Sequence, residues 1–260
     1  MSRQKLGQHF LVKTSILDRI AKAACPELPA GSEKQKEPLV VEIGPGKGAL
    51  TARLLDRAER VIAIEIDSAM LEHLAGKFSG NSRLTLVHAD ALDLNLGQWG
   101  RAVITGNLPY YAATPIIEKT LQLGNQLMYA MFLIQKEVAE RLTAAPGSRE
   151  YGYLTVRTRL SADADRLFDV HPSAFRPPPK VDSTLIRLRP HDRARELGID
   201  DAAAFLEFAG LCFHQKRKTL RNNLVGAYGK ESVDGLPEAS RRAEQLTLEQ
   251  FAELYGKLCA

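Results

Sequence analysis

Four short apolar runs in the first half of this chain are separated by segments of helical pattern, and this alternation strongly restricts the possible folds. The runs cover residues 39–43, 61–65, 84–87 and 102–105, and each has the length and side-chain type of a buried strand. Near-continuous apolar strands that alternate with helices predict a parallel sheet covered on both faces. We therefore expect an α/β fold with a Rossmann-like sheet.

Helical segments fill the intervals between these runs. The amphipathic residues 16–21 predict a helix with Thr14 as its N-cap, and Ser68 is the expected N-cap of a helix that ends near Phe78. Further helices are expected at residues 48–57 and 115–123, and two more apolar runs follow at residues 127–134 and 183–188. The strand pattern therefore extends almost to residue 190.

Past Pro190 the strand pattern stops. Residues 201–258 are helical in pattern, with breaks near Gly226, Gly229 and residues 235–237. We predict a boundary near residue 190, with a Rossmann-like domain over residues 1–190 and a small all-α domain over residues 191–260.

Composition excludes several classes of protein. The 260 residues include 45% hydrophobic residues, enough for a sizeable core, but no apolar run reaches the 18 residues that a membrane-spanning helix needs. The N-terminus does not lead into the apolar segment of a secretory signal. Cys25, Cys212 and Cys259 are far apart and have neither metal-ligand nor disulfide spacing. We expect a cytoplasmic protein without a metal site.

Basic residues are concentrated in two regions although the formal net charge is only +4. Residues 141–190 hold nine Arg and Lys against five Asp and Glu, and residues 214–221 hold four fixed positive charges and no acid. Phosphate backbones attract such clusters. The alternative interpretation is an ordinary solvated helix face.

A glycine-rich turn, Gly44-Pro45-Gly46-Lys47-Gly48, follows the first strand and opens the first helix. Glycines at this place let the backbone turn tightly and approach a ligand closely. Glu65 ends the second strand, 19 residues after Gly46, where an acid accepts hydrogen bonds from ribose hydroxyls. From these residues alone, NAD and S-adenosylmethionine both remain possible ligands.

Two further strand ends favour S-adenosylmethionine. Asp90 and Ala91 follow the third strand, where the carboxylate can accept from an adenine amino group and the backbone lies beside it. Asp90 has the alternative role of a turn or N-cap residue. The loop after the fourth strand supplies no group that handles a carbonyl, as a hydride-transferring site needs.

That loop, Gly106-Asn107-Leu108-Pro109-Tyr110-Tyr111, carries the expected chemistry. The Asn107 side-chain oxygen and the Leu108 carbonyl can accept hydrogen bonds from an amino group. Pro109 fixes φ, and Tyr110 offers a flat face on which a nucleobase can stack. The set suits a flat, amino-bearing substrate such as adenine, and the alternative is a simple proline-containing loop after a strand.

Eight sequence blocks, in order along the chain, carry a family resemblance. They are Gln8–Leu11, Glu42–Gly46, Glu65–Asp67, Asp90–Ala91, Asn107–Tyr110, Gln135–Val138, Phe175–Ser183 and Arg217–Leu224. Together they resemble the KsgA/Dim1-type ribosomal RNA adenine dimethyltransferases from about residue 4 to the C-terminus. The last block and the helical tail are more similar to the KsgA branch than to the Erm resistance methylases. One departure is His9, where the family usually has Asn.

The resemblance implies S-adenosylmethionine as methyl donor. It also implies two adjacent adenosines in a hairpin of the small-subunit (16S) rRNA as acceptors, and a monomer that acts in ribosome biogenesis. Residues 1–25 are expected to cover the cofactor, and residues 191–260 to face the RNA. The implied cofactor-binding residues are His9, Leu11, Gly44, Gly46, Glu65, Ile66, Asp90, Ala91 and Asn107.

The implied catalytic set joins the Asn107 loop to one distant aromatic residue. Phe175, which precedes a rigid proline run, is expected to hold the second face of a target base that leaves its stack. The full set is Asn107, Leu108, Pro109, Tyr110 and Phe175. The RNA-contacting candidates are Arg176, Lys180, Lys216, Arg217, Lys218 and Arg221.

Three other functions are also compatible with parts of this pattern. A DNA adenine-N6 methyltransferase uses a similar Asn-Pro-aromatic loop. A ribosome-assembly or RNA-binding factor needs the basic clusters but makes catalysis secondary. An NAD-dependent enzyme accounts for the glycine-rich turn and Glu65 but not for the Asn107 loop.

Overall fold

The computed structural model describes residues 9–26 and 38–259. The chain forms two compact units, one from Met1–Ala139 and Asp165–Pro190, the other from Glu140–Ala164 and His191–Ala260. Residues 140–164, which the predicted boundary near residue 190 assigns to the first domain, belong to the second unit. Tyr151, Val156 and Leu160 explain this, because they are buried in the same core as Phe205. Residues 1–8 of the expected cofactor-covering segment lie outside the described residues.

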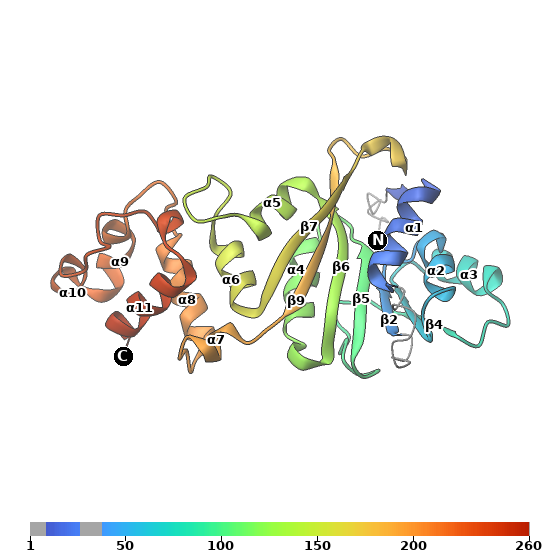
Figure 1. Cartoon of the computed structure of the whole chain (residues 1–260), viewed down its shortest axis with the longest axis horizontal. Coiled ribbons are helices and arrows are strands. Elements are labelled where there is room, and N and C mark those ends of the chain that lie inside the picture. Colours follow the sequence, from blue (N-terminus) through green and yellow to red (C-terminus); the bar gives the residue numbers. More distant parts are fainter. Residues whose placement is uncertain (1–8, 27–37, 260) are drawn as a thin grey trace, which may run out of the picture. The chain divides into compact units, whose positions relative to one another are not determined.

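A seven-stranded mixed sheet forms the centre of the first unit (Figure 1). Its order is β4-β3-β2-β5-β6-β9-β7, with β2 to β6 parallel where they pair and β9 antiparallel to β6. The strands are β2 (Leu39–Ile43), β3 (Arg60–Glu65), β4 (Leu84–His88), β5 (Ala102–Asn107), β6 (Leu127–Gln135), β7 (Ala162–Val170) and β9 (Ser183–Pro190). The predicted α/β class is confirmed, and β7 is an additional strand that the apolar pattern did not predict.

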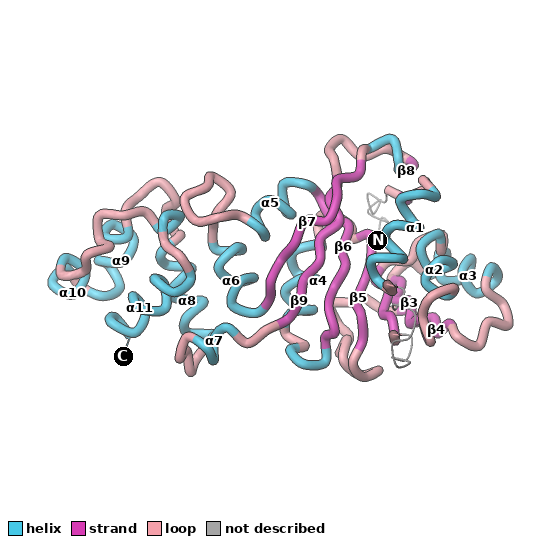
Figure 2. The backbone as a smooth tube through the Cα atoms, in the orientation of Figure 1, coloured by secondary structure: helices cyan, strands magenta, loops and turns pink. Residues whose placement is uncertain are grey.

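Helices lie on both sides of this sheet (Figure 2). They are α1 (Thr14–Ala24), α2 (Ala49–Leu55), α3 (Ser68–Lys77), α4 (Ala113–Leu121) and α5 (Lys136–Thr143). Leu17 and Ile20 of α1 share one core with Val40, Val61 and Met131 of the strands. Burying such apolar side chains contributes about 1.5–3 kcal/mol each, so this core fixes the strand ends that form the site.

Two of the predicted helix caps are wrong. The N-cap of α3 is Asp67, whose carboxylate accepts from the backbone N–H groups of Ala69 and Met70, and Ser68 is already helical. In α1, Thr14 is the first helical residue and Lys13 precedes it without a side-chain cap. A carboxylate next to the first turn outcompetes a hydroxyl because it also interacts with the helix dipole.

The second unit has a helical core. Its elements are α6 (Tyr153–Ser161), α7 (Arg193–Glu196), α8 (Ala202–Cys212), α9 (Leu220–Tyr228), α10 (Lys230–Asp234) and α11 (Leu248–Cys259). Phe205, Phe208 and Phe251 are buried at its centre. Gly229, with φ +81°, ends α9 as predicted, but Gly226 lies inside that helix instead of at a break.

Two short strands complete the first unit beside the sheet. β1 (Phe10–Leu11) pairs antiparallel with β8 (Phe175–Arg176), with Leu11 opposite Phe175. Short 3₁₀ turns occur at Gly124–Gln126, Pro172–Ala174 and Ala243–Gln245. No helix within residues 9–26 and 38–259 has the length and apolar character needed to cross a membrane.

Candidate active site

A cavity of about 430 Å³ opens at the carboxyl ends of β2, β3 and β5 in the first unit. This is the edge of a parallel sheet where ligands bind, and the volume is that of a small-molecule site. All nine candidate cofactor residues line it, from His9 to Asn107, and so do Leu108, Pro109 and Tyr110. His9 and Asn107, which lie 98 positions apart in the sequence, therefore share one cavity.

The glycine-rich turn forms one wall of this cavity. Gly44, Gly46 and Gly48 have φ values of +69°, +53° and +72°, a region that other residues rarely adopt. A Cβ atom built on Gly46 would lie 2.9 Å from the ring of Phe10, so the glycine also lets β1 close over the turn. The turn thus presents bare backbone to whatever occupies the cavity.

Glu65 fixes the turn from the end of β3. Its side chain is only 3% exposed, and one carboxylate oxygen accepts from the N–H of Gly46 at 3.0 Å. The other oxygen accepts from the N–H groups of Ile66 and Asp67, both at 3.0 Å. A carboxylate has about four acceptor positions, so Glu65 keeps capacity for ribose hydroxyls while it holds the turn.

Asp90 fits both interpretations of its sequence position. Its Oδ1 accepts from the N–H of Leu92 at 2.8 Å, as a turn residue does. Among the described residues its Oδ2 has no hydrogen-bond donor, and the half-buried side chain lines the cavity. That oxygen can accept from the exocyclic amine of an adenine ring, and Ala91 lies next to it in the cavity wall.

Asn107 is the last residue of β5, and its amide group is oriented by the N-terminal strand. Nδ2 donates to the backbone carbonyl of His9 at 2.9 Å. This bond leaves Oδ1 as the end that can accept from a ligand. The next residue, Leu108, donates its N–H to the Leu133 carbonyl at 3.1 Å, and no described donor reaches its own carbonyl. Two acceptors therefore follow one another at the end of β5.

Tyr110 is held at the same place by two contacts. Its hydroxyl lies 3.2 Å from Oγ of Ser183, and burial raises the pKa of this phenol above its ordinary value. Its ring centroid lies 5.7 Å from that of His9. His9 in turn places Nδ1 2.8 Å from the Pro177 carbonyl. Ser183 and Pro177 were not assigned a role from the sequence, since a supporting hydroxyl or carbonyl leaves no distinct pattern.

Phe175 does not lie where the resemblance implied. Its side chain is 1% exposed, packs in the main core with Leu11 and Leu17, and does not line the cavity. In β8, consecutive side chains point to opposite sides, so burying Phe175 leaves Arg176 exposed. The expected stacking role of Phe175 is therefore corrected to that of a core residue beneath β1.

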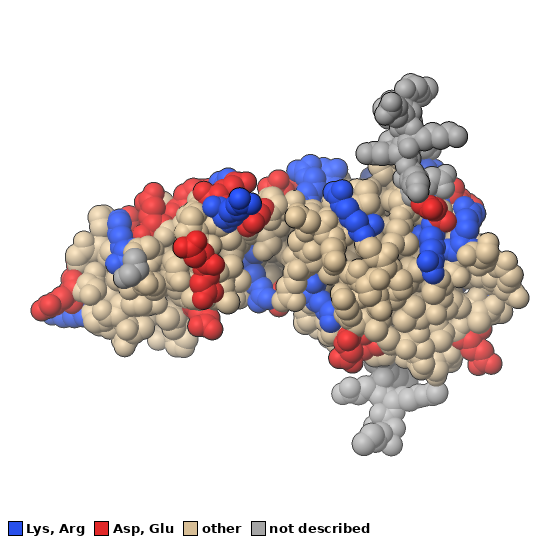
Figure 3. Space-filling view, turned by 90° about the horizontal axis from the view of Figure 1, so that it is seen from below, with Lys and Arg blue, Asp and Glu red and all other residues tan. Residues whose placement is uncertain are grey.

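The basic candidates differ in how free their charges are. Arg176 and Lys180 are exposed in the first unit, and Lys216, Arg217 and Lys218 are exposed in the second. Arg221 is different because it pairs with Asp234, with Nε 2.5 Å from Oδ1. Lys and Arg lie among Asp and Glu on the face drawn in Figure 3, so no face-wide field of one sign appears there.

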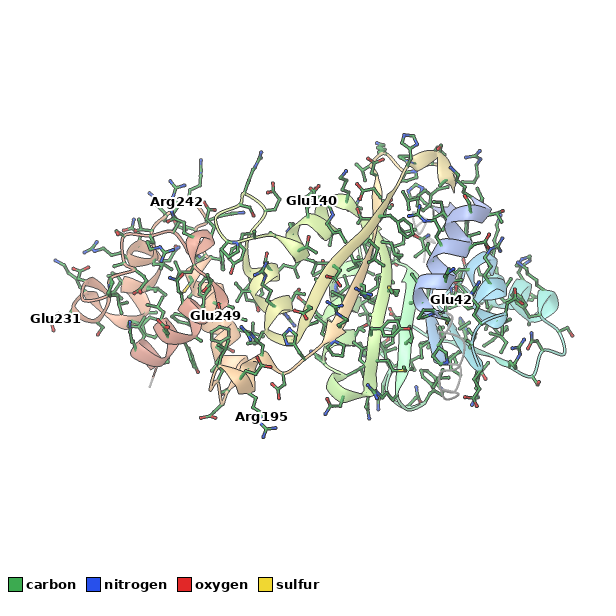
Figure 4. All side chains as sticks on the ribbon, in the orientation of Figure 1. Glu42, Glu140, Arg195, Glu231, Arg242 and Glu249 are labelled. Atoms are coloured by element: carbon green, nitrogen blue, oxygen red, sulfur yellow. The ribbon has the colours of Figure 1, made fainter. Side chains whose placement is uncertain are left out.

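Glu42 also lines the cavity, although no role was predicted for it from the sequence. It lies on β2 (Figure 4), is 1% exposed and accepts from Oγ1 of Thr51 at 2.6 Å. Burial raises the pKa of its carboxyl to about 7, with the nearby Glu65 acting in the same direction. An acid inside an apolar strand was the available signal for this residue.

Taken together, the fold and the cavity define a class. S-adenosylmethionine fits the bare glycine backbone and the carboxylates of Glu65 and Asp90, which can accept from ribose hydroxyls and from adenine. An amino-bearing substrate fits the two acceptors of Asn107 and Leu108 at the end of β5. The first unit is the catalytic unit of an S-adenosylmethionine-dependent methyltransferase.

Comparison with known proteins gives the family. The model of the ribosomal RNA adenine dimethylase family matches residues 1–258, and the chain belongs to this family. The ribosomal RNA small subunit methyltransferase A of Acidobacterium capsulatum is 40% identical over 266 residues, which cover 98% of this chain and 91% of the relative. The protein of the same name from Geobacter sulfurreducens is 36% identical over 273 residues, with 100% and 96% covered.

Solved structures agree over nearly the whole chain. A dimethyladenosine transferase from Plasmodium falciparum has a TM-score of 0.78 at 28% identity, with 96% of this chain and 98% of that chain covered. The 23S rRNA methyltransferase ErmE has a TM-score of 0.72 at 27% identity, with 96% and 100% covered. The chain is thus a methyltransferase with S-adenosylmethionine as its cofactor, and the NAD alternative is not retained.

Proposed function

We propose that this protein dimethylates the exocyclic N6 amines of two adjacent adenosines in a hairpin near the 3′ end of the small-subunit (16S) rRNA. It acts as a monomer in the cytoplasm, on the small subunit or its precursor, during ribosome biogenesis. The small-subunit substrate is supported by the names of the two bacterial relatives, both ribosomal RNA small subunit methyltransferase A. The adenine amine is supported by the acceptors at Asn107 and Leu108.

The orientation of the Asn107 amide carries the chemical argument. An adenine amine is a poor nucleophile because its lone pair is delocalised into the ring. Asn107 Oδ1 and the Leu108 carbonyl accept its two N–H bonds, which favours a pyramidal nitrogen with a localised lone pair. Since the His9 carbonyl already fixes the amide, these acceptors need no reorganisation during the reaction.

S-adenosylmethionine, when bound, supplies an electrophilic methyl group on a sulfonium. Asn107 Oδ1 and the Leu108 carbonyl would hold the amine in the cavity that receives this methyl group, so the reaction would gain from proximity and orientation. No strong base is needed, because the nitrogen becomes very acidic once it is alkylated and loses its proton to water. Position and oriented dipoles account for the acceleration.

A base inside a helix cannot reach this cavity, so the target adenosine must leave its stack. Tyr110 offers one ring face at the cavity, and its hydroxyl bond to Ser183 limits rotation of the ring. We assign the base-holding role to Tyr110 without Phe175, which is buried. The RNA backbone is held through the exposed charges of Arg176, Lys180, Lys216, Arg217 and Lys218.

The test uses labelled S-adenosylmethionine with under-methylated small ribosomal subunits, and duplex DNA as the competing acceptor. The modified bases are then mapped. We expect label on two adjacent adenosines of the 16S rRNA, two methyl groups on each, and no label on DNA. Label on DNA, or on RNA bases other than adenine, would refute the proposed substrate.

A further inference from the structure

Glu42 is a buried titratable group that the proposed chemistry does not use. It lies one residue before the end of β2 and lines the same cavity as Glu65. The two carboxyl groups differ in the number of hydrogen bonds that they accept. Glu65 accepts three backbone N–H bonds, whereas Glu42 accepts one hydrogen bond, from Thr51.

Two charged side chains on further elements act on the Glu42 carboxyl group. Glu65 on β3 disfavours its charge, and Lys77 on α3 favours it. The Lys77 ammonium group is committed to the glycine-rich turn, where it donates to the carbonyls of Lys47 at 2.8 Å and Gly48 at 3.2 Å. With a pKa of about 7, Glu42 is divided between its protonated and ionised forms near neutral pH.

The reaction changes the charge of the ligand that occupies this cavity. S-adenosylmethionine carries a sulfonium cation, and after methyl transfer S-adenosylhomocysteine carries a neutral thioether. The adenosine, carboxylate and ammonium groups of the two molecules are identical. A nearby cation favours ionisation of a carboxyl group, so a group poised between two protonation states responds to this one difference.

We propose that Glu42 is a specificity-determining residue that distinguishes the methyl donor from the spent product by charge. Donor binding ionises Glu42 and expels its proton, whereas product binding leaves the proton in place. Donor affinity therefore rises as the pH increases through about 7, because less of Glu42 must then be deprotonated on binding. Product affinity lacks this rise, so the ratio of donor affinity to product affinity increases with pH, and Glu42 takes up its proton again when bound donor is converted to product. This inference rests on the proposed function.

The experiment measures protons released on binding. Calorimetric titrations with S-adenosylmethionine and with S-adenosylhomocysteine are run at pH 6, 7 and 8, each in two buffers of different ionisation enthalpy. Subtracting the product value from the donor value cancels protons from all groups that meet both ligands alike. The readout is independent of turnover.

For the wild-type protein we expect the donor to release about half a proton more than the product at pH 7, more at pH 6 and less at pH 8. Glu42→Gln should abolish the difference and make the donor-to-product affinity ratio independent of pH. Thr51→Val keeps the carboxyl group but removes the bond that favours its charge, so the release should extend to higher pH. Thermal unfolding of each variant checks that it folds.

Equal proton release for both ligands in the wild-type protein would overturn the inference and leave the proposed function intact. A difference that survives in a folded Glu42→Gln variant would also overturn it. If Glu42→Gln does not fold, the wild-type and Thr51→Val titrations decide the question. Failure of both ligands to bind would overturn the proposed function together with the inference.

Discussion

The two ends of the Asn107 side-chain amide have different partners, and the proposed catalysis depends on that difference. The nitrogen end meets the His9 carbonyl, and the oxygen end is left for a ligand. The sequence predicted Asn107 as an acceptor but not the His9 carbonyl as its partner. A backbone carbonyl is present at every residue, so no residue type marks that partner in advance. Glu42 and Ser183 were missed for a related reason, because their roles depend on distant neighbours.

Glu65 gives a prediction at this scale. Replacing it with alanine removes the acceptor for the Gly46 N–H and the expected acceptor for ribose hydroxyls. We expect Glu65→Ala to weaken S-adenosylhomocysteine binding by about 1–3 kcal/mol, as measured by calorimetry. Glu72→Ala, at an exposed position of α3, is the control and should leave affinity unchanged. Wild-type affinity in Glu65→Ala would count against the contact.

At the scale of elements, β2, β3, β5 and β6 were predictable as apolar runs because they are largely buried in the parallel part of the sheet. β7 was not, since its exposed residues recur at every third position, 163, 166 and 169, without the alternation typical of a strand, and it lies at the edge of the sheet. β1 and β8 have two residues each, too few for a periodic pattern. The pairing of β1 with β8 brings His9 to Asn107 and buries Phe175. The stacking role predicted for Phe175 was wrong because sequence periodicity cannot reveal strands this short.

The contact between α3 and the glycine-rich turn provides a stability test. A Cβ atom at Gly48 would lie 2.7 Å from Leu74 and Phe78, in addition to the strain of φ +72°. We expect Gly48→Ala to lower the free energy of unfolding by about 2–4 kcal/mol in denaturant titrations. Gly80→Ala is the matched control, because Gly80 has φ +78° and nothing within 4 Å. Equal losses in the two variants would show that the packing against α3 contributes nothing.

At the scale of the whole molecule, the sequence predicted two parts and a helical tail, but not that residues 140–164 return to the tail's unit. The apolar positions of α6 are not distinctive by themselves. They become core positions only when Phe205 and Phe251 are placed beside them. The basic cluster at residues 214–221 was likewise visible in sequence, while the pairing of Arg221 with Asp234 depends on how α9 and α10 meet.

Among the described residues Asp234 neutralises Arg221, whereas Lys216, Arg217 and Lys218 have no acidic partner, and RNA binding can tell the two kinds of charge apart. Replacing Lys216, Arg217 and Lys218 together by alanine should reduce the slope of log affinity against log salt by about 2, at roughly 0.7–0.9 per phosphate contact. Arg221→Ala should change the slope much less, because its charge is already paired. Filter binding of small-subunit RNA over a salt series measures both. An unchanged slope in the triple variant would show that these three residues do not contact the RNA phosphates.

The catalytic role of the Asn107 amide is best tested by the rate of methyl transfer by Asn107→Ala under single-turnover conditions, with saturating S-adenosylmethionine and under-methylated small subunits. Loss of one preorganised acceptor should slow transfer by roughly 10²–10³-fold, while thermal unfolding stays close to that of the wild-type protein. Asn125→Ala, an exposed asparagine in the 3₁₀ turn, should react at the wild-type rate. A folded Asn107→Ala protein that transfers methyl groups at near-wild-type rate would contradict the role of this amide.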